Sequence, residues 1–368
     1  MRFFLLAAGV VFALVLCISC GGGGGDTIKI GVAGPMTGDQ AKMGNDEVNG
    51  ATIAVEEWNA KGGVLGKKIE LVNGDDRRDP KEAVSVANKL VNEGVVGVIG
   101  HFNSSCTIPA STIYNEAKVI QITPASTNPA YTKQGFKGAF RICGTDDQQG
   151  RYAADYAVNV LKKSRIAVLH DKTTYGQGLA DEFKKGLEGR AEVVAYEGIT
   201  QGDKDFTAVL TSVKGQNPEV IFFGGIYPEA GLLMQQMRKL GMDAQLISGD
   251  GTIDPEYIKI AGNAAEGTLC TYSPSVDKLP SAKNFLDTYI PRFGEPGPYS
   301  IYSYDAVGML LTAIKETGST DYDKLAARLH EMKYEGAKGT SQFDEKGDLT
   351  VAPYIMWVVK GGKFVPCE

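Results

Sequence analysis

Short apolar runs alternate with amphipathic helical patterns along most of this chain, and this alternation constrains the fold more than any other feature. The first series predicts strands at 28–33, 68–72, 95–99 and 119–123, and helices at 43–59, at 80–93 and from Ser104 onward. Such alternation is typical of a parallel sheet with helices on both faces. We therefore expect a doubly wound α/β lobe.

A second series of the same kind follows residues 140–143. It predicts strands at 165–170, 192–196, 220–223 and 245–248, and helices at 150–162, 175–187, 206–213, 229–240 and after Pro255. The similar size and order of the two series indicate a second doubly wound lobe.

The last part of the chain departs from this pattern. Helical patterns at 282–290, 301–317 and 322–332 precede a strand pair at 354–359 and 364–365, turned at Gly361-Gly362. Those helices need a lobe to pack on. A chain that returns in this way would cross between the lobes more than once, so we expect discontinuous domains and a hinge of several strands.

The first residues have the pattern of an export signal. Arg2 precedes an apolar run at 3–16 that is too short to span a bilayer. Small Ser19 stands before Cys20, and five glycines follow, which would form a flexible tether. We expect a signal peptide at 1–19, a lipidated Cys20 and a tether at 20–25. A plain cleaved signal, with Cys20 incidental, is the alternative.

Composition excludes several classes of protein. A net charge of −6 without a long basic run argues against a nucleic-acid surface. The cysteines after the tether form no CxxC motif and the chain has three histidines, so no metal site is expected. Export would permit disulfides among Cys106, Cys143, Cys270 and Cys367 without establishing them. Walker A, HExxH and GxSxG motifs are absent, so we expect neither an enzyme nor a cofactor.

The candidate site residues lie in loops that follow strands, where open α/β sheets bind ligands. Ser104 opens a helix after such a strand, and a helix start favours an anion such as a carboxylate. Ser104 as a simple helix cap is the alternative. The loop 123–129 follows the next strand and offers hydroxyl groups, N–H groups and a carbonyl, or forms a plain turn.

The second lobe offers Asp250, which stands between two glycines after a strand. Its carboxylate could reach a ligand ammonium group, or it could simply stabilise the turn through its own side chain. Tyr175 and Tyr227 lie in two further loops of this lobe. They are either aromatic residues of a cleft or packing residues at helix starts.

The chain resembles the periplasmic branched-chain amino-acid-binding proteins of ABC importers, the leucine/isoleucine/valine-binding group. The resemblance runs from about Ile28 to Asp348 and rests on many short blocks in one order. They include Gly34-Pro35-Met36-Thr37-Gly38, Asn49-Gly50-Ala51, Val98-Ile99-Gly100-His101, Pro124-Ala125-Ser126-Thr127-Asn128-Pro129, Tyr175-Gly176, Tyr227-Pro228-Glu229 and Asp344-Glu345-Lys346-Gly347-Asp348.

This resemblance implies a type I periplasmic binding protein fold, in which three crossings join two lobes. With crossings near 145, 274 and 351, the N-terminal lobe comprises 26–145 plus 275–351, and the C-terminal lobe comprises 146–274 plus 352–368. In some members a cysteine pair stands where this chain has Arg78 and Asn103, so that disulfide cannot form here.

The resemblance also implies roles for individual residues. Ser104 and Thr127 would hold an α-carboxylate, while the Ala125 carbonyl, Thr127 and Asp250 would hold an α-ammonium group. Tyr175 would close over the ligand from the second lobe. Met43 and Ile226 stand where better-known members have large aromatic residues, and Phe102 and Tyr227 could also border the cavity.

The expected function is therefore the capture of a free amino acid, branched and aliphatic like leucine, isoleucine or valine. A monomer anchored by lipid in the periplasm or at the cell surface would deliver it to an ABC permease and its ATPase in the cytoplasmic membrane. An amino-acid or amide sensor ectodomain or regulator of the same fold is the alternative.

Overall fold

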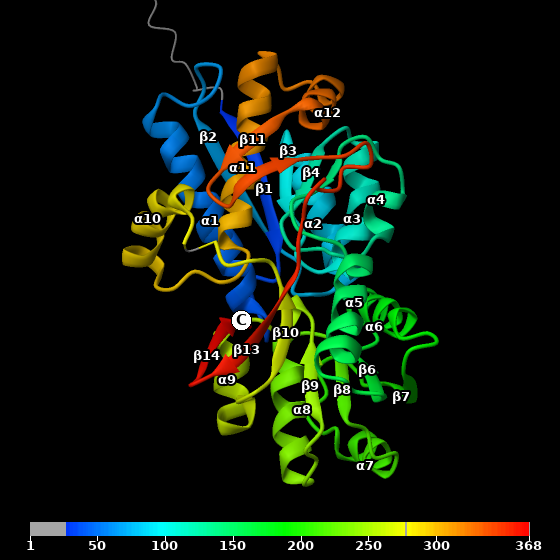
Figure 1. Cartoon of the computed structure of the whole chain (residues 1–368). Helices are drawn as coiled ribbons and strands as arrows, with labels where there is room; N and C mark the ends of the chain where they lie inside the picture. Colours follow the sequence, from blue (N-terminus) through cyan, green and yellow to red (C-terminus); the bar gives the residue numbers. More distant parts are fainter. Residues whose placement is uncertain (1–26, 277, 368) are drawn as a thin grey trace, which may run out of the picture.

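The computed structural model describes residues 27–276 and 278–367, which form two α/β lobes stacked end to end (Figure 1). The expected signal peptide, Cys20 and the glycine tether lie outside the described residues. Within the described ranges, no helix is both long and apolar enough to cross a lipid bilayer.

The first lobe is built on a five-stranded parallel sheet in the order β2-β1-β3-β4-β5. Its strands are β1 (Ile28–Gly34), β2 (Ile69–Asp75), β3 (Gly97–Gly100), β4 (Ile120–Thr123) and β5 (Ala139–Arg141). Strand residues such as Val32, Ile99 and Ile122 are fully buried. Helices cover both faces, which explains why these strands are continuous apolar runs.

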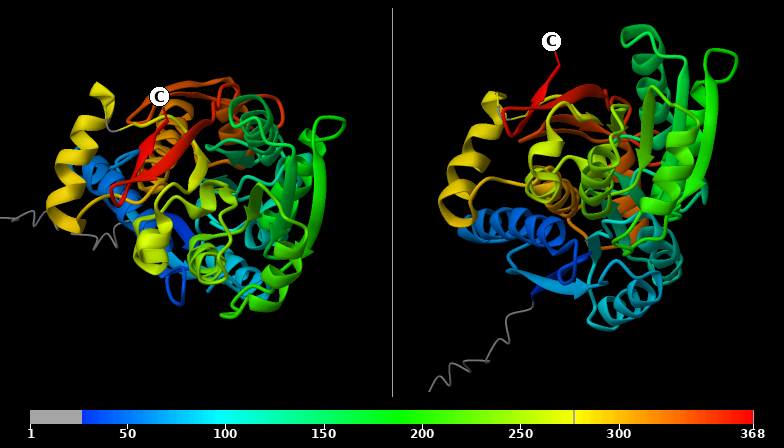
Figure 2. Two further views of the ribbon diagram at one scale, coloured as in Figure 1. Left: turned by 60° about the horizontal axis from the view of Figure 1, so that its bottom comes forward. Right: turned by 90° about the horizontal axis from the view of Figure 1, so that it is seen from below.

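Two groups of helices cover this sheet. On one face, α2 (Pro80–Asn92) packs against α3 (Ser104–Glu116). On the other, α1 (Ala41–Ala60) packs against α10 (Lys283–Phe293) and α11 (Ser300–Thr317), which come from the far end of the chain (Figure 2). The short α4 (Ala130–Lys133) and α12 (Tyr322–Glu331) complete the helices of this lobe.

The second lobe is built on a seven-stranded sheet in the order β14-β13-β10-β9-β8-β6-β7. Five of its strands are parallel: β6 (Arg165–His170), β7 (Glu192–Gly198), β8 (Val220–Gly224), β9 (Gln245–Ser248) and β10 (Leu269–Tyr272). The antiparallel strands β13 (Ile355–Lys360) and β14 (Lys363–Pro366) extend one edge.

Helices also cover both faces of this second sheet. The pair α5 (Asp146–Asp155) and α6 (Thr174–Gly186) packs together on one face. The other helices of the lobe are α7 (Thr207–Gly215), α8 (Tyr227–Lys239) and α9 (Pro255–Ala261), and α8 packs against both α7 and α9.

The chain passes between the lobes three times: after β5, after β10 and before β13. The segment between the second and third passages carries α10, α11, α12 and a hairpin of β11 (Lys333–Gly336) and β12 (Gly339–Gln342). This topology confirms the predicted doubly wound α/β fold with a three-crossing hinge. The exact domain boundaries stay a prediction.

Several elements differ from those that periodicity predicts. The helix expected at 150–162 begins at Asp146 and ends in a π-helical turn, Tyr156–Val160. Apolar periodicity is strong only after Gly150, while the acidic residues before it suit the positive end of a helix. The strand β10 and the hairpin β11–β12 are short and partly polar, and the sequence patterns did not indicate them.

Candidate functional site

A narrow cavity of about 20 Å³ lies between the two lobes, beside the carboxyl ends of the central strands. Small-molecule pockets commonly measure about 300–1,000 Å³, so the side chains that line this cavity would have to move apart to admit a small metabolite. Its lining comprises Phe102, Asn103, Ser104, Ala125, Tyr175, Ile226, Asp250, Gly251 and Tyr299. The structure thus brings together six of the nine residues that the sequence singled out.

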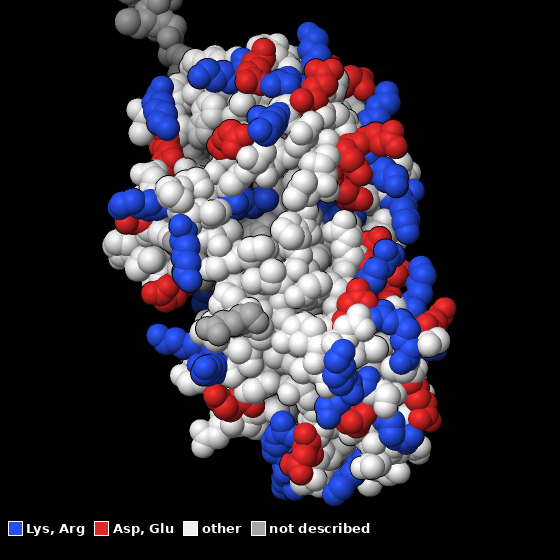
Figure 3. All heavy atoms as spheres, in the orientation of Figure 1, with Lys and Arg blue, Asp and Glu red and all other residues white. Residues whose placement is uncertain are grey.

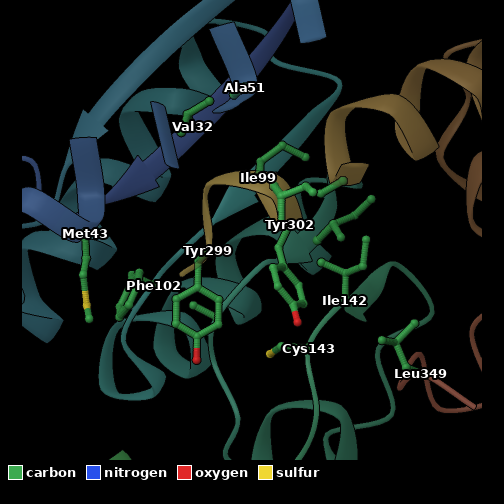
Figure 4. Packing of buried hydrophobic residues seen from close by; sticks show 14 of the residues in the cluster. Val32, Met43, Ala51, Ile99, Phe102, Ile142, Cys143, Tyr299, Tyr302 and Leu349 are labelled. Atoms are coloured by element: carbon green, nitrogen blue, oxygen red, sulfur yellow. The ribbon is translucent and has the colours of Figure 1, made fainter. Parts of the chain in front are cut away.

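Three of the nine, Met43, Thr127 and Tyr227, do not line this cavity. Met43 is buried and lies beside Phe102, with its sulfur pointing the same way as the Phe102 ring (Figure 4). Tyr227 of the second lobe contacts the first lobe, because its hydroxyl donates to the carbonyl of Asp39 at 2.7 Å. The hydroxyl oxygen of Thr127 is buried without a hydrogen-bond partner among the described residues.

The first-lobe wall is the start of helix α3. Asn103 occupies the N-cap position and Ser104 is the first helical residue, so the interpretation of Ser104 as a cap is wrong. The Ser104 hydroxyl oxygen accepts the backbone N–H of Asn128 at 3.3 Å, which ties the helix start to the loop after β4. The helix start directs N–H groups and a positive partial charge toward this end of the cavity.

Arg141, at the end of β5, forms hydrogen bonds with the loop after β4. Its guanidinium is fully buried and donates to the carbonyls of Ser126 at 3.0 Å and Asn128 at 2.8 Å. It also pairs with Asp348 at 2.7 Å. A buried cation with all these partners fixes the loop that carries Ala125, and no pattern in the sequence indicated this role of Arg141.

Asp250, on a short 3₁₀ turn after β9, is the acidic group of the cavity and is 3% exposed. Tyr175 of α6 donates to one carboxylate oxygen at 2.8 Å, and Tyr299 of the first lobe donates to the other. Burial raises the pKa of Asp250, while the Tyr299, Tyr175 and Gln149 side chains oppose that shift. The carboxylate therefore contacts residues of both lobes.

Further polar groups around Asp250 were not identified from the sequence. Asp146 at the start of α5 is fully buried, and neither carboxylate oxygen has a hydrogen-bond partner among the described residues. The oxygen and nitrogen atoms of the Gln149 side-chain amide are likewise buried without a hydrogen-bond partner among the described residues. Burial raises the pKa of Asp146 well above its usual value, and the charge on Asp250 adds to the shift, while the Thr127 hydroxyl opposes it. Buried polar atoms without partners are costly, so these groups favour a polar ligand between them.

Apolar side chains bound the rest of the cavity. Phe102 meets Tyr299 edge to face, with ring centroids 5.3 Å apart, and Figure 4 shows the two rings next to each other. Ile226, at the N-cap of α8, lies against Gly251 from the second lobe. The cavity therefore has a polar side, at Ser104 and Asp250, and an apolar side.

The lobes are in direct contact around this cavity. Arg78 of the first lobe forms two hydrogen bonds, at 3.3 and 3.2 Å, with the Glu229 carboxylate of the second, and lies 3.7 Å from Asp171. The Asn128 side-chain amide donates to the carbonyl of Thr174 at 2.8 Å. These contacts define a closed arrangement of the two lobes.

In the described part of the chain the possible metal ligands are dispersed. No group of three or more His, Cys, Asp or Glu side chains there could hold a metal ion. The cysteines at 106, 143, 270 and 367 are free thiols.

Comparisons with known proteins agree with this architecture. A model of the family described as periplasmic binding protein matches residues 27–363. The Leu/Ile/Val-binding protein homolog 1 of Brucella suis is 44% identical, over 96% of this chain and 95% of its own length.

Solved structures show the same fold. The leucine-binding protein LivK of Thermotoga maritima is 35% identical, with a TM-score of 0.87 over 93% of this chain and 98% of its own. The LivJ protein of Streptococcus pneumoniae in complex with isoleucine is 31% identical, with a TM-score of 0.84 over 93% and 100%. This chain belongs to the periplasmic binding protein family, with the type I fold that its sequence predicted.

Proposed function

We propose that the cavity between the lobes captures one free L-α-amino acid with a branched aliphatic side chain. The observation that carries this proposal is a cavity between the lobes with a buried carboxylate, Asp250, on its polar side and hydrocarbon, Phe102 and Ile226, on the other. The relatives named for leucine, isoleucine and valine support the same ligand class.

The polar side of the cavity suits the two charges of an amino acid. The ligand carboxylate would accept hydrogen bonds from the Ser104 hydroxyl and from N–H groups at the start of α3. The ligand ammonium would face Asp250 and the Ala125 carbonyl. The Thr127 hydroxyl, which does not line the cavity in this arrangement, would join them when the ligand binds. An anion and a cation placed in this way neutralise each other's desolvation cost.

The apolar side suits the ligand side chain. Each buried methylene of that side chain contributes about 0.8 kcal/mol, whereas a charged side chain would lose its hydration without a partner. Met43 lies beside Phe102, where its unbranched thioether would adapt the packing around the cavity to a leucine, isoleucine or valine side chain.

Binding would be a hinge motion, and no bond would be made or broken. An open form exposes the Ser104 site, the amino acid binds there, and the second lobe closes with Asp250 and Tyr175 over the ligand. The family is extracytoplasmic. We propose that this protein acts as a monomer, anchored through a lipidated Cys20, and passes its ligand to an ABC permease and its ATPase.

Calorimetry against all common amino acids tests the ligand assignment. We expect leucine, isoleucine or valine to bind most tightly, and glutamate and lysine to compete poorly. The ligand must also raise the melting temperature, because it binds only the folded state. A clear preference for an acidic or basic amino acid, or conversion of any bound amino acid to product, would refute this proposal.

Mass spectrometry of the mature N-terminus tests the anchor. We expect a diacylated or triacylated Cys20 in the membrane fraction, and a Cys20→Ala variant released from it. An unmodified Cys20 in the wild-type protein would remove the anchor and leave the ligand assignment untouched.

A further inference from the structure

A second and larger cavity, of about 220 Å³, lies at the hinge and is distinct from the space that would hold the amino acid. All three passages between the lobes contribute to its wall: Gly144 from the first, Ser273 from the second and Tyr354 from the third. The first lobe adds Tyr302 and Lys338. These segments meet at the centre of Figure 1, on a face where Figure 3 shows a broad band of uncharged residues.

The two cavities share a wall. Asp250 and Tyr299 line both of them, and the Tyr299 hydroxyl donates to the Asp250 carboxylate. In Figure 4, Tyr299 and Tyr302 lie side by side with their hydroxyl groups pointing the same way. A molecule in the hinge cavity would therefore contact the residue that holds Asp250 in place.

Most of the tyrosine hydroxyl groups around this cavity already form hydrogen bonds with other groups of the protein. Tyr302 donates to the Ser273 hydroxyl at 2.7 Å, and Tyr272 donates to the carbonyl of Pro298. Tyr272 meets Tyr299 edge to face at 5.8 Å. The rings, together with nearby proline and aliphatic side chains, thus offer apolar faces that suit a flat hydrocarbon body.

The single cation in the lining is Lys338, in the turn between β11 and β12. Its ammonium group lies 5.2 Å from the centroid of the Tyr302 ring. Burial lowers the pKa of Lys338, and Asp305 opposes the shift. The Asp305 carboxylate accepts the backbone N–H groups of Ala337 and Lys338 at 2.7 and 2.8 Å. Across residues 27–276 and 278–367, no carboxylate forms an ion pair with this ammonium group.

We propose that the hinge cavity binds a small organic monocarboxylate with a flat apolar body. Its carboxylate pairs with the ammonium group of Lys338, and its body lies among the rings of Tyr272, Tyr302 and Tyr354. A cation that already lacks an acidic partner gains one, and the apolar faces are removed from water. The ligand carries no ammonium group, so it has no complement for Asp250 in the amino-acid site.

Occupation of this cavity is coupled to closure. Its walls come from both lobes and from every passage between them, so rotation about the hinge changes its shape. A ligand that fits the cavity of the closed arrangement favours that arrangement and so raises the affinity for the amino acid. By linkage, the amino acid raises the affinity for the hinge-cavity ligand by the same factor.

Fluorine NMR with 4-fluorobenzoate tests the site in protein saturated with the amino acid that calorimetry identifies. We expect saturable broadening of the probe signal that persists in excess amino acid. Lys338→Met should weaken binding at least about tenfold, because the stem remains and only the charge is lost. The matched control is Lys333→Met, an exposed lysine on the same hairpin, which should bind the probe like the wild type.

A second pair of variants does not depend on the buried lysine. Val351 lines the cavity and is 74% exposed, so changes there should leave the fold intact. We expect Val351→Asp to weaken probe binding and Val351→Lys to strengthen it.

Three results would overturn the proposal: no saturable broadening, equal binding to wild type and Lys338→Met, or displacement of the probe by the amino acid, which would place it in the first cavity. Since amino-acid binding is measured separately, failure here leaves the proposed function standing.

Discussion

Two buried aspartates, Asp250 and Asp146, lie around one cavity with different surroundings. Asp250 receives hydroxyl groups from two tyrosines, whereas the oxygens of Asp146 have no hydrogen-bond partner in the described part of the chain. Burial raises the pKa of both carboxyl groups, and the charge on Asp250 raises the pKa of Asp146 further, so Asp146 holds its proton more firmly. We infer that Asp250 carries the negative charge that faces the ligand, and that Asp146 is neutral.

This difference predicts that replacement by asparagine affects leucine binding strongly at one aspartate and weakly at the other. Asp250→Asn should weaken leucine binding more than about a hundredfold, because losing one partner of a buried ion pair costs about 3–5 kcal/mol. Asp146→Asn should change the affinity less than about tenfold, because an amide mimics a neutral carboxyl group. Calorimetry on both variants measures this. If Asp146→Asn had the larger effect, the assignment of charge would be reversed.

The pH dependence of leucine binding follows from the ionisation of Asp250. Burial raises the pKa of Asp250 above its usual value, and only the ionised form pairs with an ammonium group. Leucine affinity should therefore fall as the pH drops through that raised pKa, while bound ligand should lower the pKa. Calorimetric titrations across acidic pH test this. An unchanged affinity, or the same slope in Asp250→Asn, would contradict it.

The sequence predicted those site residues that follow a strand directly. Ser104, Ala125 and Asp250 were identified because parallel strands end at the same edge of a sheet. Tyr299 could not be identified in this way, because it comes from a helix start on the returning segment, 49 residues from Asp250. Asp146 begins a helix just after an interlobe passage, and periodicity does not give the path of such a passage in space.

At the scale of elements, helix α11 brings the returning chain onto the first lobe. It packs against α1 at Gly50, where an added Cβ atom would lie 2.0 Å from the carbonyl oxygen of Ser300. The Ser303 hydroxyl donates to the carbonyl of Glu47 at 2.7 Å. This backbone approach gives a physical reason for glycine in the block Asn49-Gly50-Ala51.

Gly50→Ala should therefore destabilise the first lobe. Forcing the helices apart typically costs about 1–3 kcal/mol. Leucine binding should weaken as well, because Tyr299 directly precedes α11. Urea unfolding and calorimetry measure both effects. Gly215→Ala is the control, since nothing lies within 4 Å of an added Cβ atom at this position at the end of α7. Equal unfolding midpoints for the two variants would refute the close-packing argument.

The loop after β2 supplies a contact that holds the lobes together. Arg78 is nearly buried between Glu229 and Asp171. Burial raises the pKa of Asp171 to about 6, with the Thr173 donors and Arg78 opposing the shift. Removing the cation would leave two carboxylates facing each other in the closed arrangement, whereas water can solvate them when the lobes separate.

Arg78→Ala should thus weaken leucine binding about tenfold or more with little loss of thermal stability in the unliganded protein. Its neighbour Arg77 has a side chain that is 70% exposed, so Arg77→Ala is a matched control and should bind leucine normally. Calorimetry and thermal unfolding separate the two effects. A large drop in melting temperature without ligand would make Arg78 a folding residue instead.

Periodicity predicted the long elements of both lobes better than the short ones. Strands such as β6 and β8 are buried on both sides and read as apolar runs. The strand β10 contains cysteine, threonine and tyrosine among its four residues, and the hairpin β11–β12 is half exposed. Their positions depend on contacts with distant parts of the chain, which local patterns do not encode.

At the scale of the whole molecule, the site exists only where the two lobes meet. Ser104 and Phe102 belong to one lobe, and Tyr175, Ile226 and Asp250 belong to the other. Each lobe has its own sheet and a buried cluster confined to it, so each can keep its fold when the lobes separate, although a third buried cluster contains residues of both lobes. A ligand held between them contributes its contacts only to the closed arrangement, and this difference is what drives closure.

Closure should therefore be visible in solution. We expect small-angle X-ray scattering to give a larger radius of gyration for the unliganded protein than for the protein saturated with leucine, because without ligand only the few direct contacts between the lobes, such as those of Arg78, compete with hydration of both lobe faces. The Asp250→Asn variant, which lacks the charge that pairs with the ligand ammonium, should keep the larger radius at leucine concentrations that close the wild type. Arg78→Ala should have the larger radius without ligand and still contract when leucine is raised well above its weakened dissociation constant. Identical scattering profiles for the wild type with and without leucine, under conditions where calorimetry shows binding, would mean that the lobes are already closed before the ligand arrives, and the hinge mechanism would then be wrong.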